Sequence, residues 1–497
     1  MSNIIRMRAL LVTSVGVTCA AALTLPLAAP ALSAPPPHSA SALPPESPGA
    51  GPPSVRAAVL PAVESAGSTQ SLPLEPLAAP SDRSMGPATA GQGLERRTAR
   101  PFSLVGVVWD DAEAELHGTV QVRTRATGSA SWSDWQGVET HNAEHAADLG
   151  SDERSSGAVR GATAPLWVGA SDGVEVRVRP EPTDPQDRSE AAPLPEGLRL
   201  ELVDPGPDPA PGPAEEAAPE PARAAPVGRT ATAAAFALNP SPPTTTPVVV
   251  PEVLTAEAEA ASAVNAELAP LGASVIPALT KAQTEEAANV APGAKPYIGP
   301  RPGIITRKGW GADEKLRERQ FAYTKTVKAA FVHHSATGNN YTCKQAPSVL
   351  RSIYRYHVKS SGWRDFGYNF AVDKCGNIYE GRAGGVTKAV LGAHTLGFNS
   401  NTMGIAVLGS YSSTNPPAAA VTAVSKLTAW KLGLFGANPK GKVTLTSGGS
   451  NKYKAGAKVK MNVISGHRDG FATECPGARL YKKLGKARTS SAKLQGR

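Results

Sequence analysis

Ala329-Ala-Phe-Val-His333-His334-Ser335 is a short apolar run that ends in two histidines. Such a run is typical of a buried strand that carries polar side chains to a site at its tip. Neighbouring residues of a strand face opposite ways, so only one of His333 and His334 points into a given site. The local pattern leaves open which of the two it is.

Segments with helical and strand periodicity alternate around this run. Pro347 to Val358 places apolar residues at helical spacing, and Ala418 to Phe435 predicts a second helix. Four further segments are predicted strands, the first two forming a hairpin: residues 366–373, 377–380, 403–408 and 461–464. Strands that alternate with helices predict an α/β domain, with a central mixed β-sheet flanked by helices.

A different pattern occupies residues 101–204. Apolar and polar side chains alternate there in short runs such as Thr119-Val-Gln-Val-Arg-Thr124 and Leu198-Arg-Leu-Glu-Leu-Val203. Period two with turn residues between the runs predicts strands, and about a hundred such residues most simply form a separate all-β sandwich domain. Four tryptophans in this region are more typical of a β core than of a sugar-binding surface: Trp109, Trp132, Trp135 and Trp167.

Composition divides the rest of the chain. Residues 1–34 combine two arginines with an apolar run and a small-residue stretch, which is typical of a secretory signal peptide. Residues 35–100 are rich in Pro, Ala, Ser and Gly and are predicted to be disordered. Residues 205–300 are predicted to be a Pro/Ala-rich linker, helical only in part. Residues 301–485 then hold the α/β domain, and residues 486–497 form a basic tail.

Charge also separates the two halves. Residues 301–497 contain 32 Lys and Arg and eight Asp and Glu, a net charge of +24, whereas the first 300 residues contain 19 and 34, a net charge of −15. A basic exported domain concentrates near polyanions, which for a cell-wall protein would include anionic wall polymers. A solvated basic surface without a specific partner is the alternative. We expect a secreted monomer, extracellular or attached to the cell wall, with no transmembrane anchor after signal cleavage and no nucleic-acid partner.

Three cysteines remain once the signal peptide is removed, and exported proteins usually pair theirs. Cys475 follows His467 by eight positions, on the loop after a predicted strand, and is a candidate metal ligand. Cys343 and Cys375 are then left to form a disulfide. Two imidazoles and one thiolate suit Zn²⁺, and three protein ligands leave the fourth position of a catalytic site for water.

Six motifs follow one another between about residues 300 and 485. They are Arg307-x-x-Trp-Gly-Ala-Asp313, Phe331-Val-His-His-Ser335, Gly362-Trp-x-Asp-x-Gly-Tyr-Asn-Phe370, Ile378-Tyr-Glu-Gly-Arg382, Gly392-Ala-His-Thr395, and Gly466-His-Arg-Asp469 through Thr473-x-Cys-Pro-Gly477. Together they resemble the peptidoglycan recognition protein family and the related phage-lysozyme type amidases. The resemblance implies a zinc N-acetylmuramoyl-L-alanine amidase, which cuts peptidoglycan between the lactyl group of N-acetylmuramic acid and L-alanine.

The resemblance also implies roles for single residues. Tyr368 matches the tyrosine that hydrogen-bonds the zinc-bound water or the developing oxyanion. Thr473 stands where phage relatives have lysine, and a hydroxyl orients a partner without supplying positive charge. His334 is expected to be structural. The implied zinc ligands are His333, His467 and Cys475.

Four residues are expected to bind substrate. Arg382 is expected to hold a carboxylate of the stem peptide, because a guanidinium grips a carboxylate with two parallel bonds. Family members that recognise diaminopimelate stems have Gly-Trp where this chain has Ala383-Gly384, which leaves the stem type open. The other three residues, which line the expected groove or else are simply packed side chains, are His357, Trp363 and His394.

Two other functions remain as alternatives. A non-catalytic family member binds peptidoglycan without cutting it, but such members commonly lack the ligand cysteine that Cys475 provides here. A metal hydrolase acting on another amide is the second alternative. Arg468 and Asp469 either orient His467 or form a structural ion pair.

Overall fold

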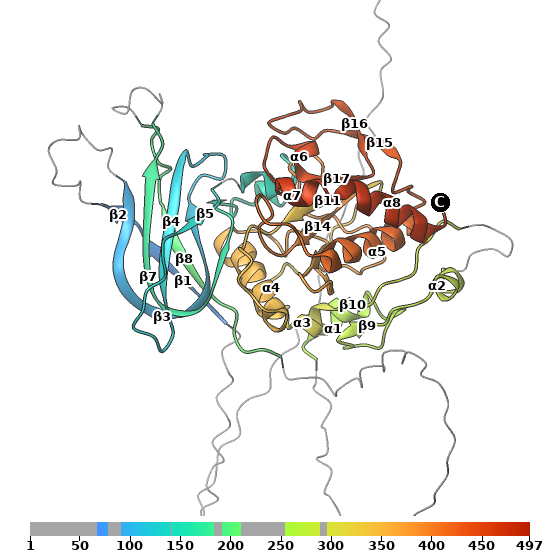
Figure 1. Ribbon diagram of the computed structural model, residues 1–497, viewed down its shortest axis with the longest axis horizontal. Coiled ribbons are helices and arrows are strands. Elements are labelled where there is room, and N and C mark those ends of the chain that lie inside the picture. The colour runs from blue at the N-terminus through green and yellow to red at the C-terminus, as the bar shows by residue number, and fades with distance from the viewer. Residues whose placement is uncertain (1–66, 78–90, 141, 183–190, 210–253, 289–295) are drawn as a thin grey trace, which may run out of the picture. The chain divides into compact units, whose positions relative to one another are not determined.

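The computed structural model describes residues 67–77, 91–140, 142–182, 191–209, 254–288 and 296–497. The predicted signal peptide lies outside these residues, as do parts of the predicted disordered segment and linker. The described residues form an N-terminal antiparallel β domain and a C-terminal domain with a mixed, helix-flanked sheet (Figure 1). The fold class predicted from the sequence is therefore confirmed.

The sheet of the C-terminal domain has seven strands, and β11 lies next to its edge strand β17. Parallel pairs join β11 to β14 and β17, whereas β12 and β13 form the predicted antiparallel hairpin. In order across the sheet the strands are β17 (Ile464–Gly466), β11 (Ala329–His334), β14 (Thr402–Val407), β12 (Phe370–Val372), β13 (Ile378–Glu380), β10 (Ile304–Ile305) and β9 (Val275–Ile276).

Helices cover both faces of this sheet (Figure 1). On one face, α5 (Ala418–Leu434) and α8 (Leu484–Gln495) share an apolar cluster with Val332 of β11. On the other, α4 (Ala346–Arg355) shares a second cluster with Ala406 of β14. Because both faces are covered, the central strands β11 and β14 are buried along their whole length and show no polar–apolar alternation. The shorter elements are α1 (Ala256–Ala263), α2 (Lys281–Ala287), α3 (Arg307–Trp310), η3 (Cys343–Gln345), η4 (Tyr356–Ser360), β15 (Lys442–Thr446), β16 (Lys458–Asn462), α6 (His467–Gly470) and α7 (Ala478–Tyr481).

The N-terminal domain is a single hydrogen-bonded antiparallel sheet around its own apolar core. Its long strand β3 pairs with β7 along most of its length and with β8 near its end. Register shifts against β7 mark bulges, which bend a strand and let one sheet curl around a core. The strands are β1 (Ser68–Pro73), β2 (Glu75–Pro76), β3 (Gln92–Trp109), β4 (Gly118–Ala126), β5 (Gln136–Val138), β6 (Gly161–Ala162), β7 (Leu166–Pro180) and β8 (Arg199–Asp204), with one-turn helices η1 (Ala143–His145) and η2 (Arg154–Ser156).

The end of β3 belongs to two cores at once. Val105 and Val107 lie in the core of the N-terminal domain, whereas Leu104 and Val108 join the cluster that contains α4. Gly106 permits this approach, because a Cβ there would overlap the ring of Tyr356. The two domains therefore share an apolar interface.

Regular structure occurs within residues 35–100, which were predicted to be disordered, and within residues 205–300, which were predicted to be a linker that is helical in part. Within residues 35–100, β1 and the start of β3 form strands. The strand β1 is mostly polar and is held by its pairing with β8, so it lacks the apolar alternation that identifies a strand. Within residues 205–300, α1, β9 and α2 are ordered, and β9 joins the C-terminal sheet through β10.

The predicted basic tail at residues 486–497 includes most of helix α8. Its buried face includes Ala487, Ser491 and Ala492, besides Leu484 and Gln495. Small side chains allow a helix to pack closely but give little hydrophobic periodicity.

The cysteines separate into two kinds. Cys343 in η3 and Cys375 in the turn between β12 and β13 form a disulfide. Cys475 is free and buried. In the described part of the chain, no helix is both long and apolar enough to cross a membrane.

Glu380, at the end of β13, is a buried carboxyl whose protonation is expected to affect stability. Its oxygens accept hydrogen bonds from the Asn265 amide (2.8 Å) and the Arg307 backbone N–H (3.2 Å). Burial raises its pKa to about 7, from an ordinary value of 4.5. The folded state therefore binds the proton more tightly, and this stabilisation is present below pH 4.5 and lost as the pH rises through 7.

Glu380→Gln keeps the shape of the side chain and removes the ionisation. We expect the stability of this variant relative to wild type to be about 2 kcal/mol more favourable at pH 8 than at pH 5.5. Urea unfolding of both proteins at the two pH values measures this difference, and other titrating groups cancel in it. The same difference at both pH values would contradict the prediction.

Candidate metal centre

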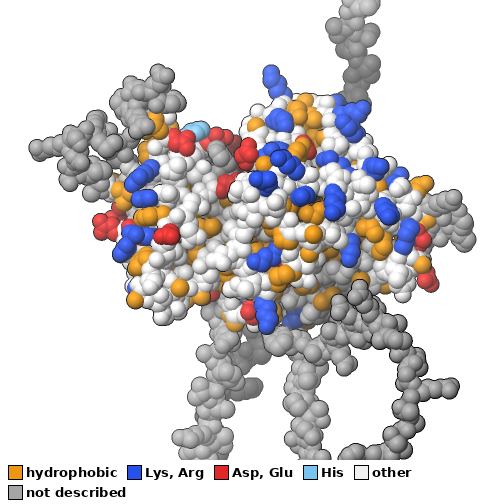
Figure 2. All heavy atoms as spheres, viewed as in Figure 1, with side chains coloured by type: hydrophobic (Ala, Val, Ile, Leu, Met, Phe, Trp, Pro, Cys, Tyr) orange, Lys and Arg blue, Asp and Glu red, His pale blue; other side chains and the backbone are white. Residues whose placement is uncertain are grey.

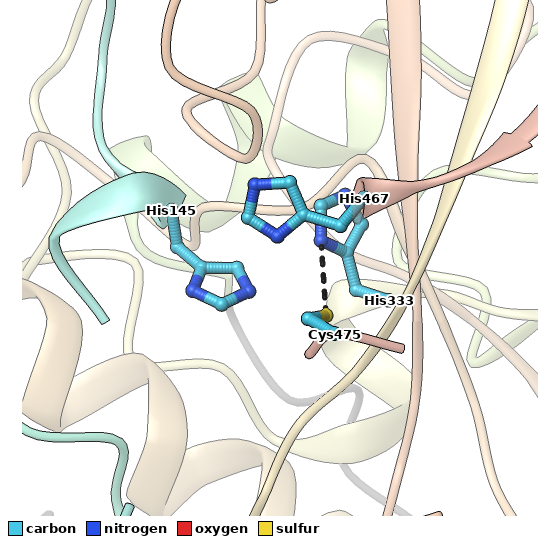
Figure 3. A group of neighbouring side chains, drawn as sticks. All are labelled: His145, His333, His467 and Cys475. Atoms are coloured by element: carbon cyan, nitrogen blue, oxygen red, sulfur yellow. Dashed lines mark hydrogen bonds between the residues drawn. The ribbon is translucent and has the colours of Figure 1, made fainter. Parts of the chain in front are cut away.

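Four side chains from distant parts of the sequence meet in one buried cluster (Figure 3). Their potential ligand atoms all lie within 4.8 Å of one another. Cys475 Sγ is 3.8 Å from His333 Nδ1, and the rings of His333 and His467 are 4.5 Å apart. The cluster includes the three residues predicted as ligands and one that was not predicted: His145, His333, His467 and Cys475.

The sheet positions two of these side chains. β11 and β17 are parallel neighbours, with Val332 opposite Gly466, so His333 and His467 emerge beside each other at the same edge. His334 faces the other way, where its Nδ1 accepts a hydrogen bond from the Tyr411 backbone N–H (3.3 Å). Strand alternation thus directs His333 toward the cluster.

The loop that carries Cys475 is tied to the turn that carries His467. The Arg468 backbone N–H donates to the Cys475 carbonyl (3.0 Å), and the Arg468 guanidinium donates to the Glu474 carboxylate (2.8 Å). Asp469 accepts from the Gly466 N–H (2.9 Å) and so caps the same turn. These contacts favour a structural role for Arg468 and Asp469.

The electrostatics of the cluster suit a metal ion. Burial lowers the pKa of His145, His333 and His467, so their imidazoles are neutral and able to act as ligands. Burial also raises the pKa of the Cys475 thiol, and a bound cation is what would favour its thiolate. Within the described residues, both ring nitrogens of His145 and of His467 are buried without a hydrogen-bond partner. Such atoms are rare in proteins, and a metal ion would give each ring a partner.

A further contact orients the His333 ring. Thr395 Oγ1 lies 3.3 Å from His333 Nε2, which leaves Nδ1 facing Cys475. His394 supports this arrangement, since its Nδ1 is 3.0 Å from the same hydroxyl. Partners of this kind commonly fix the orientation of metal-binding histidines.

The two predicted catalytic residues border the cluster. Tyr368 is buried, with its ring 5.2 Å from that of His333 and 6.0 Å from that of His145. The Thr473 hydroxyl accepts from the Cys475 N–H (3.2 Å) and donates to the Glu144 carboxylate (2.8 Å). Thr473 therefore links the loop that carries Cys475 to the N-terminal domain.

The four residues predicted to bind substrate are all buried. His357 stacks on Trp363 with ring centroids 4.3 Å apart. Arg382 forms two 2.8 Å hydrogen bonds with the Glu153 carboxylate, so its guanidinium already holds an acid of this chain. His394 is fully buried and lies 5.4 Å from the His333 ring, where it packs beside a candidate ligand.

Both domains of the chain are similar to known proteins. A family model for N-acetylmuramoyl-L-alanine amidase matches residues 323–478, and one for Rv3811 N-terminal galactose-binding domain-like matches residues 58–196. Peptidoglycan-recognition protein SC2 of Drosophila melanogaster is 31% identical over 183 residues, which are 36% of this chain and 84% of that protein. The chain belongs to the peptidoglycan-recognition protein family.

Other members of the family are similar over the same domain. Human N-acetylmuramoyl-L-alanine amidase is 32% identical over 187 residues, 37% of this chain and 28% of that protein. The solved structure of Drosophila PGRP-LB is 25% identical, covering 36% of this chain and 91% of that one, with a TM-score of 0.29.

One residue of the cluster, His145, was not predicted from the sequence. His145 lies in the long connection between β5 and β6, in which the described residues form two regular elements, the one-turn helices η1 and η2. Long connections without regular structure are usually functional, and this was the one available signal. Nothing in the local pattern indicates that the connection reaches a cluster in the other domain.

Proposed function

We propose that the chain is a zinc-dependent N-acetylmuramoyl-L-alanine amidase. In this proposal it hydrolyses the amide between the lactyl group of N-acetylmuramic acid and the L-alanine of peptidoglycan stem peptides. The observation that carries the proposal is the convergence of His333, His467 and Cys475 within the domain that matches the amidase family model. Cys475 matters most, because a binding protein without activity needs no thiolate there.

Zinc fits this set of donors better than other common ions. Neutral imidazole with thiolate is a usual zinc environment, and carboxylate or carbonyl oxygens would be expected for magnesium or calcium. A tetrahedral zinc holds a sulfur and a nitrogen ligand about 3.6 Å apart at ordinary bond lengths. The observed separation of Cys475 Sγ and His333 Nδ1 is 3.8 Å. A bound zinc ion would polarise the amide carbonyl and lower the pKa of a water molecule.

The chain's own residues would then orient the reaction. Burial raises the pKa of Tyr368 well above its usual range, so its hydroxyl stays protonated and available as a donor. We assign it to the oxygen of the amide carbonyl, where negative charge develops during attack. Thr473 would hold the backbone N–H of Cys475 and so position the ligand loop.

Substrate recognition is assigned to the surroundings of Arg382. We propose that its guanidinium binds a carboxylate of the stem peptide once Glu153 has left it. The stacked pair of His357 and Trp363 would form a wall of the same groove. His394 also belongs to this proposal. Because its side chain is fully buried, it would contact substrate only after the surrounding residues move.

The proposal includes the location of the protein and its macromolecular partners. Lys and Arg side chains are spread over the visible face of the C-terminal domain (Figure 2), in keeping with the net charge of +24 over residues 301–497. Such a surface favours anionic wall polymers. The disulfide between Cys343 and Cys375 is typical of an oxidising compartment, which supports a secreted protein acting at the cell wall.

The test is the release of new amino termini from defined substrates. Zinc-loaded wild-type protein and its His145→Ala variant are incubated with muramyl-peptides and with ordinary peptides of the same sequence. We expect new L-alanine amino termini from the muramyl-peptides alone, and none after zinc is removed by a chelator. Binding of peptidoglycan without new termini in either protein would support a recognition protein, and cleavage of ordinary peptides would support a different hydrolase.

A further inference from the structure

Part of the N-terminal domain lies in the candidate metal centre. We call residues 142–153, which follow β5 and precede β6, the inserted segment. Its His145 is only 5% exposed, and its ring lies 4.5 Å from that of His467 and 5.3 Å from that of His333. With His145 the cluster offers four donors. Four protein ligands make a closed zinc site, whereas a catalytic site keeps one position open.

Hydrogen bonds hold the inserted segment on both sides of His145. The Glu144 carbonyl accepts from the Leu396 N–H (2.9 Å), and its carboxylate accepts from the Thr473 hydroxyl (2.8 Å). The Asp148 carboxylate accepts from the Gly397 N–H and the Asn399 amide, each at 2.7 Å. The segment therefore contacts the amidase domain through its backbone and its acids, as a bound acidic peptide would.

At the C-terminal end of the segment, Glu153 forms an ion pair with Arg382, the proposed substrate-binding arginine. Glu153 and Arg382 are both buried, and two parallel 2.8 Å bonds join them. The backbone N–H of Arg364 adds a third bond to the same carboxylate (3.2 Å). A carboxylate of a stem peptide cannot use this guanidinium while Glu153 holds it.

The two domains also contact each other outside the inserted segment. Leu104 and Val108 of β3 pack against the cluster around α4, and the Tyr356 hydroxyl donates to the Thr163 carbonyl (3.1 Å). This interface lies outside the inserted segment. Removal of His145 from the cluster therefore leaves a large part of the contact between the domains intact.

Open space flanks the inserted segment. A cavity of about 380 Å³ lies beside residues 147–153 and is also lined by Arg364 and Leu391. A second cavity, of about 140 Å³, lies beside residues 142–144 and is also lined by Asn451 and Phe471. Separate cavities therefore lie beside both ends of the inserted segment.

We propose that the inserted segment is an internal inhibitor of the amidase: His145 is the fourth metal ligand, Glu153 blocks Arg382, and the enzyme is latent until the segment leaves the groove. This inference rests on the proposed function for its substrate, but the coordination of the metal by His145 is independent of any activity. The substrate and the inserted segment would compete for the metal ion and for Arg382.

Cobalt substitution tests the coordination directly. Wild-type protein, His145→Ala, His145→Gln and the control His117→Ala are loaded with Co²⁺ and titrated with acetohydroxamic acid, while the visible spectrum is recorded. His117 is a matched control, because it is an exposed histidine of the same domain, near Glu115. If the open form is a tenth of the population or less, removal of His145 should lower the apparent Kd of the hydroxamate by at least about tenfold.

The expected result is a different cobalt spectrum and tighter hydroxamate binding in both His145 variants, with His117→Ala matching wild type. Identical spectra and Kd values in wild type and in a folded His145 variant would overturn the proposal. Two variants are used so that misfolding of one does not decide the result.

Amidase assays of the same proteins separate this inference from the proposed function. We expect His145→Ala to cleave muramyl-peptides at least about tenfold faster than wild type at subsaturating substrate. An open cobalt site in a variant that cleaves nothing would support His145 as a ligand while contradicting the proposed amidase. Equal cleavage by wild type and variant, with equal hydroxamate binding, would support the amidase and overturn the latency.

Discussion

Cys475→Ala, combined with His145→Ala, is expected to reduce amidase activity to the uncatalysed background. The double change leaves His333 and His467 as the remaining members of the cluster, and two imidazoles are fewer ligands than zinc takes from protein in catalytic sites. The loss should exceed the decrease of about 10² to 10³-fold caused by removing one oxyanion donor, because polarisation of the carbonyl and activation of water are lost together. Zinc per chain and release of amino termini, each compared with His145→Ala alone, measure the effect.

A control variant removes the disulfide of the same domain. Cys343→Ala with Cys375→Ala, in the His145→Ala background, should keep zinc and activity but unfold more easily. That disulfide spans 32 residues, and closing such a loop contributes about 3 to 4 kcal/mol. Full activity of the Cys475 variant in the absence of zinc would show that the cluster is not the catalytic centre.

Half of the metal centre was predictable because it follows from one sheet. His333 and His467 each follow an apolar strand, and the carboxyl ends of parallel strands meet at one edge. The strand pattern alone left the choice between His333 and His334 open, and the family resemblance selected His333. The motif around Cys475 supplied the third candidate ligand, because the family resemblance includes the cysteine together with its spacing from His467.

His145 was not predictable, because its place depends on contact between two domains. That contact is made by Leu104 and Val108, in a run that looks like an ordinary core strand in the sequence. The run is apolar on both faces because it contributes to two cores, but the sequence does not indicate which part of the chain forms the second core. The pairing of Glu153 with Arg382 follows from the same contact and was equally hidden.

Tyr368→Phe is expected to lower kcat by about 10² to 10³-fold, without loss of zinc. The side chain comes from the loop before β12, and its ring contacts those of His333 and His357 at centroid distances of 5.2 and 6.0 Å. Phenylalanine keeps these ring contacts and removes the hydroxyl alone. The measurement is kcat and KM on a soluble muramyl-peptide in the His145→Ala background, with zinc content determined for each protein.

The split between the two constants distinguishes a catalytic hydroxyl from a structural one. A donor that acts on developing charge lowers kcat and leaves KM nearly unchanged, because the amide oxygen of bound substrate carries little of that charge. Tyr379→Phe is the matched control: it also removes a buried hydroxyl, one that donates to Asp373 (2.9 Å), and should lower stability by about 1 kcal/mol while leaving kcat as it was. If Tyr368→Phe raised KM and kept kcat, the hydroxyl would bind substrate without assisting the chemical step.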